Sequence, residues 1–166
     1  MGSGRRREVL TVADEIRVGV ISDTHGLLRP EAVEALRGSA LILHAGDVGD
    51  PAILEELEAL APVVTVRGNV DRGEWAQILP ETQVVEVEGA LLYMLHDVEA
   101  LDLSPQAAGF QAVIFGHSHL PEIRQEKGVL FFNPGSAGHR RFSYPVTVGR
   151  IFVGEGAVRG EIVELD

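Results

Sequence analysis

Short apolar runs alternate with amphipathic stretches along the first half of the chain. Three of the runs are short and rich in Val, Ile and Leu, and they are predicted to be buried strands: 17–23, 41–47 and 63–66. Between them, residues 30–36 carry apolar side chains at helical spacing and are followed by Gly38, a typical helix stop. Asp50 and Pro51 are a typical start for a second helix, with Asp as the N-cap and Pro at the first helical position. The pattern therefore predicts a β-α-β-α-β opening.

The second half of the chain is rich in predicted strands. Two runs predict a hairpin that turns near Gly89, and four further runs predict single strands: 84–88 and 90–95, then 112–115, 129–132, 146–153 and 157–163. A β-α-β-α-β opening followed mostly by strands predicts two sheets packed face to face with helices outside. No repeat, low-complexity block or linker divides the sequence, so we expect one domain over residues 1–166, with 1–16 as a flexible or peripheral N-terminal extension.

Composition and charge restrict the functional classes. With 45% hydrophobic and 23% charged residues, the chain has the composition of an ordinary globular protein. The 14 Lys and Arg against 25 Asp and Glu give a net charge of −11, which disfavours partners that are long nucleic acids or anionic membranes. A local cationic pocket is still compatible with this charge.

The sequence has no pattern typical of export or membrane insertion. No apolar run approaches the roughly 18 residues of a membrane helix. The basic residues near the start, within 1–7, are not followed by the apolar segment of a secretory signal. We therefore expect a cytoplasmic protein that does not bind membranes, and a homo-oligomer is left open.

Polar side chains occur where the predicted strands end. They are Asp23 and His25 after the first strand, Asp47 after the second, Asn69 after the third, His96 after the hairpin, and His117 and His119 after the next strand. From His25 to His117 the successive gaps are 22, 22, 27 and 21 residues, each the length of one strand plus one return. Because ligands bind outside the carboxyl ends of strands in open α/β sheets, we expect all seven side chains at one rim.

The local spacing of these residues supports the same interpretation. Asp23 and His25 are two residues apart, as are His117 and His119, so each pair points the same way if the chain is extended. Glycines that suit sharp turns and close backbone approach precede three of the seven: Gly46, Gly68 and Gly116. Each pair can therefore reach one small volume.

The seven side chains form a set of metal ligands without sulfur. The chain has no cysteine, and the set contains two carboxylates, one amide and four imidazoles. Such a mixed nitrogen and oxygen set suits Mn, Fe, Ni or Zn rather than Ca or Mg alone. Seven ligands are too many for one four-coordinate zinc and fit two metals that share a carboxylate, the arrangement used for in-line displacement at phosphorus. The charge of about +4 on two divalent ions would locally reverse the repulsion between this acidic chain and a phosphate.

In their order along the chain, these motifs resemble the calcineurin-like metallophosphoesterase superfamily. The motifs are Asp23-x-His25, Gly46-Asp47, Gly68-Asn69, His96 and Gly116-His117-Ser118-His119. The length of the chain and the segment Asn133-Pro134-Gly135-Ser136 are similar to its small YfcE-like phosphodiesterase branch, and the resemblance spans roughly residues 17–163. It implies an α/β fold, a four-layer αββα sandwich in which two mixed β-sheets pack face to face with flanking helices.

The resemblance also implies how two divalent transition metal ions are held. One ion has four ligands, which are Asp23, His25, Asp47 and His119. The other ion also has four ligands, which are Asp47, Asn69, His96 and His117, so that Asp47 bridges the two ions. Manganese is the first candidate for both positions, and nickel, iron and zinc are the alternatives.

Two positions depart from the family pattern. Many members follow the motif Asn with a His that assists the leaving group, whereas Val70 follows Asn69 here, so the general acid is left unassigned. The family usually has Gly after the fourth motif, whereas Asp97 follows His96 here. Asp97 either orients an imidazole or weakens binding of the second metal.

The sequence therefore predicts a metal-dependent phosphodiesterase that acts on small or nucleotide-like phosphodiesters, with in-line attack by a hydroxide that bridges the metals. The residues predicted to be catalytic are Asp47, Asn69, His96 and His117. Arg72 and Arg140 are the candidate contacts to the substrate phosphate, with a surface salt bridge as the alternative for Arg72 and with Arg141 beside Arg140 in the same loop. His44, inside an apolar strand, is expected to be a hydrogen-bonded core residue.

Two other functions are weighed against this one. A non-catalytic protein-binding scaffold that resembles the retromer subunit of the same branch is the first, but all seven ligand positions carry liganding residue types here. A metal-dependent nuclease of the superfamily is the second, but those usually carry the His after Asn and additional domains. The intact ligand set favours the phosphodiesterase with a small-molecule phosphoester as substrate.

Overall fold

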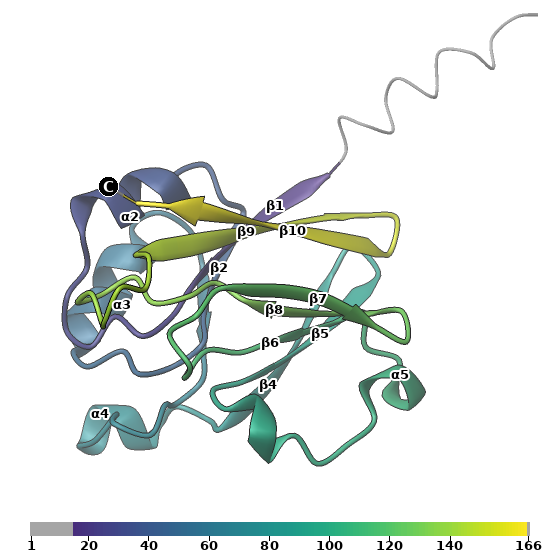
Figure 1. Ribbon diagram of the computed structural model, residues 1–166, viewed down its shortest axis with the longest axis horizontal. Helices are drawn as coiled ribbons and strands as arrows, with labels where there is room; N and C mark the ends of the chain where they lie inside the picture. The colour runs from purple at the N-terminus through teal and green to yellow at the C-terminus, as the bar shows by residue number, and fades with distance from the viewer. Residues whose placement is uncertain (1–14, 166) are drawn as a thin grey trace, which may run out of the picture.

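The computed structural model describes residues 15–165, which form two mixed five-stranded sheets (Figure 1). The first sheet contains, in spatial order, β10 (Ala157–Glu164), β9 (Thr147–Gly154), β1 (Ile16–Ile21), β2 (Leu41–His44) and β3 (Val63–Thr65). The second contains β4 (Thr82–Val87), β5 (Ala90–Leu95), β6 (Ala112–Ile114), β8 (Val129–Asn133) and β7 (Glu122–Glu126). The strands β1, β2 and β3 run parallel, as do β5, β6 and β8. Their carboxyl ends therefore meet at one edge of each sheet.

The main hydrophobic core lies between the two sheets. Val20 and Leu43 from the first sheet and Met94, Ile114 and Phe132 from the second are fully buried in one cluster. Because side chains alternate along a strand, the neighbours of these residues face outward and need a second covering layer. The two sheets therefore form the inner layers of the fold.

Helices cover the outer face of the first sheet. α2 (Pro30–Leu36) and α3 (Pro51–Glu58) bury Leu36 and Leu57 against Ile21 and Ile42, and both lie at the left of Figure 1. α4 (Glu74–Gln77) adds the partly buried Trp75 to the same cluster. The apolar faces of these helices are thus packed on the first sheet.

The outer face of the second sheet has a thinner cover. It consists of the 3₁₀ turn η2 (Val98–Ala100), the four-residue helix α5 (Pro105–Ala108) and the segment around them. Val98, Leu103 and Phe110 pack on Tyr93 and Val113 there. The four-layer αββα sandwich is therefore confirmed, with one outer layer reduced to single turns.

Most predicted elements are confirmed, and the differences have physical reasons. α2 and α3 have the expected starts, and the Asp50 carboxylate accepts a hydrogen bond from the Ala52 N–H at 2.9 Å. β1 and β2 end earlier than predicted, because the backbone turns sharply before Asp23 and Asp47. β7 was not predicted from the sequence, because it is a polar edge strand in which Arg124 pairs with two glutamates rather than with a core.

The N-terminal extension predicted over 1–16 lies outside the described residues except at its end. There Ile16 is the first residue of β1, and the Glu15 carboxylate pairs with Arg159 at 2.9 Å. Within residues 15–165 no helix is long and apolar enough to cross a membrane.

Candidate metal centre

The seven predicted ligands lie together beyond the carboxyl ends of the parallel strands. Five of them have a backbone in the left-handed region, with φ values of 56° for Asp23, 48° for His25, 58° for Asp47, 73° for His117 and 69° for His119. The expectation that the two i, i+2 pairs are extended is therefore wrong. Residues other than glycine rarely adopt this backbone conformation, and each instance costs of order 1–3 kcal/mol. Tight turns after the strands, rather than strand alternation, aim these side chains.

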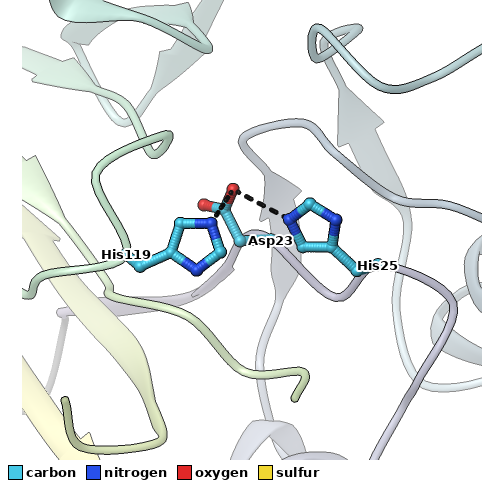
Figure 2. Close-up of side chains that lie close together, drawn as sticks. All are labelled: Asp23, His25 and His119. Carbon is cyan, nitrogen blue, oxygen red and sulfur yellow. Dashed lines mark ion pairs between the residues drawn. The ribbon is translucent and has the colours of Figure 1, made fainter. Parts of the chain in front are cut away.

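The first group of ligands consists of Asp23, His25 and His119 (Figure 2). The Nε2 atoms of His25 and His119 lie 3.6 Å and 3.5 Å from Oδ1 of Asp23. The two imidazoles stack with ring centroids 5.2 Å apart, one on each side of the carboxylate. These three side chains enclose one small volume, as the sequence predicts.

The second group, Asp23, Asp47 and His96, lies beside the first and shares Asp23 with it, whose Oδ1 is 3.9 Å from Nε2 of His96. Oδ2 of Asp47 is 3.6 Å from Nε2 of His25 and 3.1 Å from Nε2 of His96. Nδ1 of His117 is 3.4 Å from Nε2 of His96 and 3.2 Å from Oδ1 of Asn69. One carboxylate oxygen of Asp47 thus faces imidazoles of both groups.

Hydrogen bonds orient both carboxylates. Oδ2 of Asp23 accepts hydrogen bonds from the Ser22 hydroxyl at 2.7 Å and from the His117 N–H at 3.0 Å. Oδ1 of Asp47 accepts one from the Val70 N–H at 2.9 Å. In each residue one oxygen is held by the protein and the other faces the imidazoles.

The residues present fit a pair of metal ions. Oδ1 of Asp23 and Nε2 of His25 are buried and have no hydrogen-bond partner among the described residues. Buried polar atoms without partners are rare and costly, and a divalent cation between them would satisfy both. Nδ1 of His96 lies 2.7 Å from the Ala45 carbonyl oxygen, which can only accept, so Nε2 of His96 presents a lone pair to the site. The donor set is the nitrogen and oxygen set expected for transition metals.

The charges of the site favour ionised carboxylates. Burial raises the pKa of Asp23 and of Asp47, but the nearby imidazoles of His25 and His96 outweigh it, so both pKa values lie below the usual range. Burial lowers the pKa of His96, but the contact with Asp47 outweighs it and raises that pKa. For His119, burial and the charge of Arg141 lower the pKa despite Asp23. Both carboxylates are thus in the form that binds a cation.

Asp71 holds two ligand-bearing loops together. Its carboxylate is buried and accepts hydrogen bonds from the backbone N–H groups of Asp47 at 3.0 Å, Gly49 at 3.0 Å and Gly68 at 2.8 Å. Sequence analysis did not identify this role. The only available signal was its position two residues after the motif Asn69.

His44 connects two further ligand loops from within the core. It is fully buried, its Nδ1 accepts a hydrogen bond from the Gly46 N–H at 3.1 Å, and its Nε2 lies 3.0 Å from the Thr24 hydroxyl. That hydroxyl donates to the Val48 carbonyl oxygen at 2.8 Å, so it accepts the proton on Nε2. Burial lowers the pKa of His44 to about 4, which keeps the ring neutral. The core role expected for His44 is confirmed.

Two cavities each adjoin three or more of the ligands. One of about 270 Å³ is lined by His25, His117 and His119 and also by Arg141 and Phe142. The other, of about 460 Å³, has a mixed wall that includes the carboxylates of Glu81, Asp97 and Asp102. Asn69 and His117 line both cavities and separate them.

The two predicted substrate contacts lie outside these cavities. Arg72 is exposed and lines neither of them. Arg140 donates from Nη1 to the Tyr144 carbonyl oxygen at 2.9 Å, and its neighbour Arg141 lines the smaller cavity instead. Asp97 accepts a hydrogen bond from the Glu99 N–H at 3.0 Å, and its second oxygen lies 3.9 Å from Nε2 of His117.

Comparison with known proteins agrees with this geometry. The sequence model of the calcineurin-like phosphoesterase superfamily domain matches residues 16–155. A protein of Methanothermobacter thermautotrophicus named a probable metallophosphoesterase is 40% identical over 140 residues, which are 77% of this chain and 81% of that protein. The phosphodiesterase YfcE of Escherichia coli is 27% identical over 112 residues, which are 60% of this chain and 58% of YfcE.

A solved structure with low sequence identity shares the fold of this chain. Vps29 of Entamoeba histolytica, complexed with Zn²⁺, has a TM-score of 0.71 and 22% sequence identity, covering 91% of this chain and 100% of Vps29. The segment matched by the family model contains all seven strand-end side chains described above. The chain belongs to the calcineurin-like phosphoesterase superfamily.

Proposed function

We propose that this chain is a phosphodiesterase that hydrolyses small or nucleotide-like phosphodiesters with two divalent transition metal ions. The observation that carries the proposal is the position of Asp47, whose Oδ2 lies 3.6 Å from His25 and 3.1 Å from His96. A carboxylate that two metal ions share must lie between two groups of imidazoles, as this one does. When bound, such ions generate a nucleophile from water at neutral pH and neutralise charge on the phosphoryl oxygens.

The proposed ligands divide into two sets. The first ion would be held by Asp23, His25, Asp47 and His119, and the second by Asp47, Asn69, His96 and His117. Manganese is the first candidate, with nickel, iron and zinc as alternatives, because the ligand set contains nitrogen and oxygen without sulfur.

The smaller cavity is the proposed position of the phosphoryl group. The smaller cavity is lined by His25, His117 and His119 together with Arg141. Arg141 offers a guanidinium to a phosphoryl oxygen, the pairing that Arg forms best. The net charge of −11 still disfavours long nucleic acids, so we propose a small phosphoester as substrate. The cytoplasmic location expected from the sequence stays a prediction.

A protein-binding scaffold is the second candidate, because the fold is shared with Vps29. That Vps29 structure contains Zn²⁺, so metal binding alone does not separate the two functions. Turnover does separate them. The relative YfcE is named a phosphodiesterase, and all seven ligand positions are intact in this chain, which favours the enzyme.

The test combines metal analysis with a diester assay. The purified chain should bind about two metal ions and hydrolyse bis(p-nitrophenyl) phosphate with added Mn²⁺. Asp47→Asn should lose the activity while the circular dichroism spectrum is retained. Asp50→Asn is the matched control, because it removes the same charge at an exposed helix N-cap where Asn caps equally well. Less than half an ion per chain, with no turnover under any divalent ion, would contradict the proposal.

A further inference from the structure

Phe142 is an exposed aromatic residue with a strained backbone conformation. It is 84% exposed, the highest value among the exposed large hydrophobic residues of the described chain. Its backbone φ is 53°, in the left-handed region that bulky residues rarely adopt. A residue that is both exposed and strained gains nothing from core packing, and such residues are concentrated at binding and catalytic sites.

The surrounding turn fixes this ring at the mouth of the smaller cavity. Phe142 and Tyr144 both line that cavity, and their ring centroids are 5.4 Å apart with planes at 58°. The Tyr144 N–H donates to the Arg141 carbonyl oxygen at 3.0 Å, and the Tyr144 carbonyl oxygen accepts from Arg140 at 2.9 Å. Arg140, though outside the cavity, thus closes the turn that presents its neighbours.

The same turn places a cation beside the aromatic ring. Arg141 lines the cavity together with His25, His119 and Phe142, and its charge acts on the imidazole of His119. Arginine pairs with phosphoryl oxygens, and aromatic side chains stack on bases and aryl groups in a sequence-tolerant way. A cation next to an exposed ring is suited to a phosphate ester that carries an aromatic group.

The larger cavity offers a different environment. Its wall includes Tyr93 and Leu95, but it also carries three carboxylates whose charge disfavours a phosphate ester: Glu81, Asp97 and Asp102. Arg67 also lines it, but its guanidinium is paired with Glu81 at 2.9 Å. An aromatic ester arm is therefore better accommodated at the turn formed by residues 139–144 than in the larger cavity.

We propose that Phe142 stacks on the aromatic group of a phosphate ester, such as a nucleobase, while Arg141 pairs with one of its phosphoryl oxygens. This deepens the proposed function and rests on it, because it assumes that the phosphoryl group lies over the ligands of the smaller cavity. It assigns the turn 139–144 as the determinant of substrate class. The cavity of about 270 Å³ holds the phosphoryl group, and the ring of the ligand lies across its mouth.

The test compares two ligands that differ only in the aromatic base. Affinities of the Mn²⁺-loaded full chain for thymidine 5′-phosphate and for 2-deoxyribose 5-phosphate are measured by titration calorimetry. The wild type should bind the nucleotide roughly tenfold more tightly. Phe142→Leu should remove this preference and leave the affinity for the sugar phosphate unchanged, and Phe142→Tyr should retain the preference. Ile78→Ala is the control, because Ile78 is 82% exposed and lines neither cavity.

Each other result overturns the inference. Equal affinity of the wild type for the two ligands, or no binding of either, contradicts it, as does a preference that survives Phe142→Leu. A change in gel-filtration volume with an unchanged preference would assign Phe142 to a contact between copies of the chain instead. Binding is measured without turnover, so a chain that prefers the nucleotide but hydrolyses no diester contradicts the proposed function and not this inference.

Discussion

The carboxylate of Asp71 accepts a hydrogen bond from the backbone N–H of Asp47 at 3.0 Å, across two loops that are 24 residues apart in sequence. The same carboxylate accepts from the N–H groups of Gly49 and Gly68. It therefore joins the loop after β2, which carries Asp47, to the loop after β3, which carries Asn69. The relative position of these two proposed ligands depends on one side chain that binds no metal itself.

Asp71→Asn should weaken metal binding while the fold is retained. The amide keeps one acceptor oxygen but turns an NH₂ group toward backbone donors, so at least one buried N–H loses its partner, at about 1–3 kcal/mol. We expect Mn²⁺ affinity to fall roughly tenfold, as for other residues that orient ligands. Urea denaturation of the metal-free chain and Mn²⁺ calorimetry measure the two effects. Asp50→Asn serves as the control, and an unchanged Mn²⁺ affinity would show that the loops are held by other contacts.

His44 predicts how stability depends on pH. Burial lowers its pKa to about 4 in the folded chain, from 6.5 in an exposed imidazole. The unfolded chain therefore takes up this proton first, so the stabilisation is complete above about pH 6.5 and is lost as the pH falls toward 4. The loss between pH 7 and pH 4.5 should be about 2–3 kcal/mol.

His44→Gln isolates this effect. Gln does not titrate, so urea denaturation of the metal-free variant should show a pH dependence that is shallower by that amount, although the variant is less stable at pH 7. The exposed His139→Gln is the matched control and should retain the wild-type pH dependence. If the dependence is the same in His44→Gln and wild type, the ring is not buried in its neutral form.

Asp97 is expected to strengthen metal binding by His117 rather than weaken it. Its Oδ2 lies 3.9 Å from Nε2 of His117, on the side of the ring opposite the nitrogen that faces Asn69 and His96. A carboxylate there orients an imidazole and increases its basicity. Asp97→Asn preserves the cap on the Glu99 N–H, and it should lower the affinity for the weaker of two Mn²⁺ ions several-fold in calorimetry. A higher affinity in the variant would support the opposite reading, that the carboxylate weakens the second site.

Much of the fold was predictable from the sequence because it depends on local patterns. Apolar periodicity and the Asp50-Pro51 start are sufficient to place α3, and the order of strands and helices is sufficient for the two packed sheets. The polar edge strand β7 could not be predicted, since its residues pair with each other and show no apolar alternation.

The site shows the same division between local and long-range information. The strand ends predict which side chains meet, but not the left-handed turns at Asp23 and His117 that aim them. Asp71 acts through backbone N–H groups of another loop, which no residue pattern reveals. The choice between Arg140 and Arg141 depends on the direction of a turn that the Tyr144 backbone closes. These features need the folded chain because they join segments that are distant in sequence.

Gly68 offers a steric test of the close approach between the loops after β2 and β3. A Cβ atom at this position would lie 2.1 Å from the backbone nitrogen of Asp47 and 2.2 Å from its Oδ1, so Gly68→Ala must displace the proposed shared ligand. We expect a loss of about 1–3 kcal/mol in the free energy of unfolding and at least a tenfold loss in Mn²⁺ affinity. Gly154→Ala is the matched control, because its Cβ would meet only Glu15, at 3.3 Å from Cγ and 3.8 Å from Cα. Equal Mn²⁺ affinity in the two variants, measured by calorimetry, would mean that metal binding does not depend on this contact.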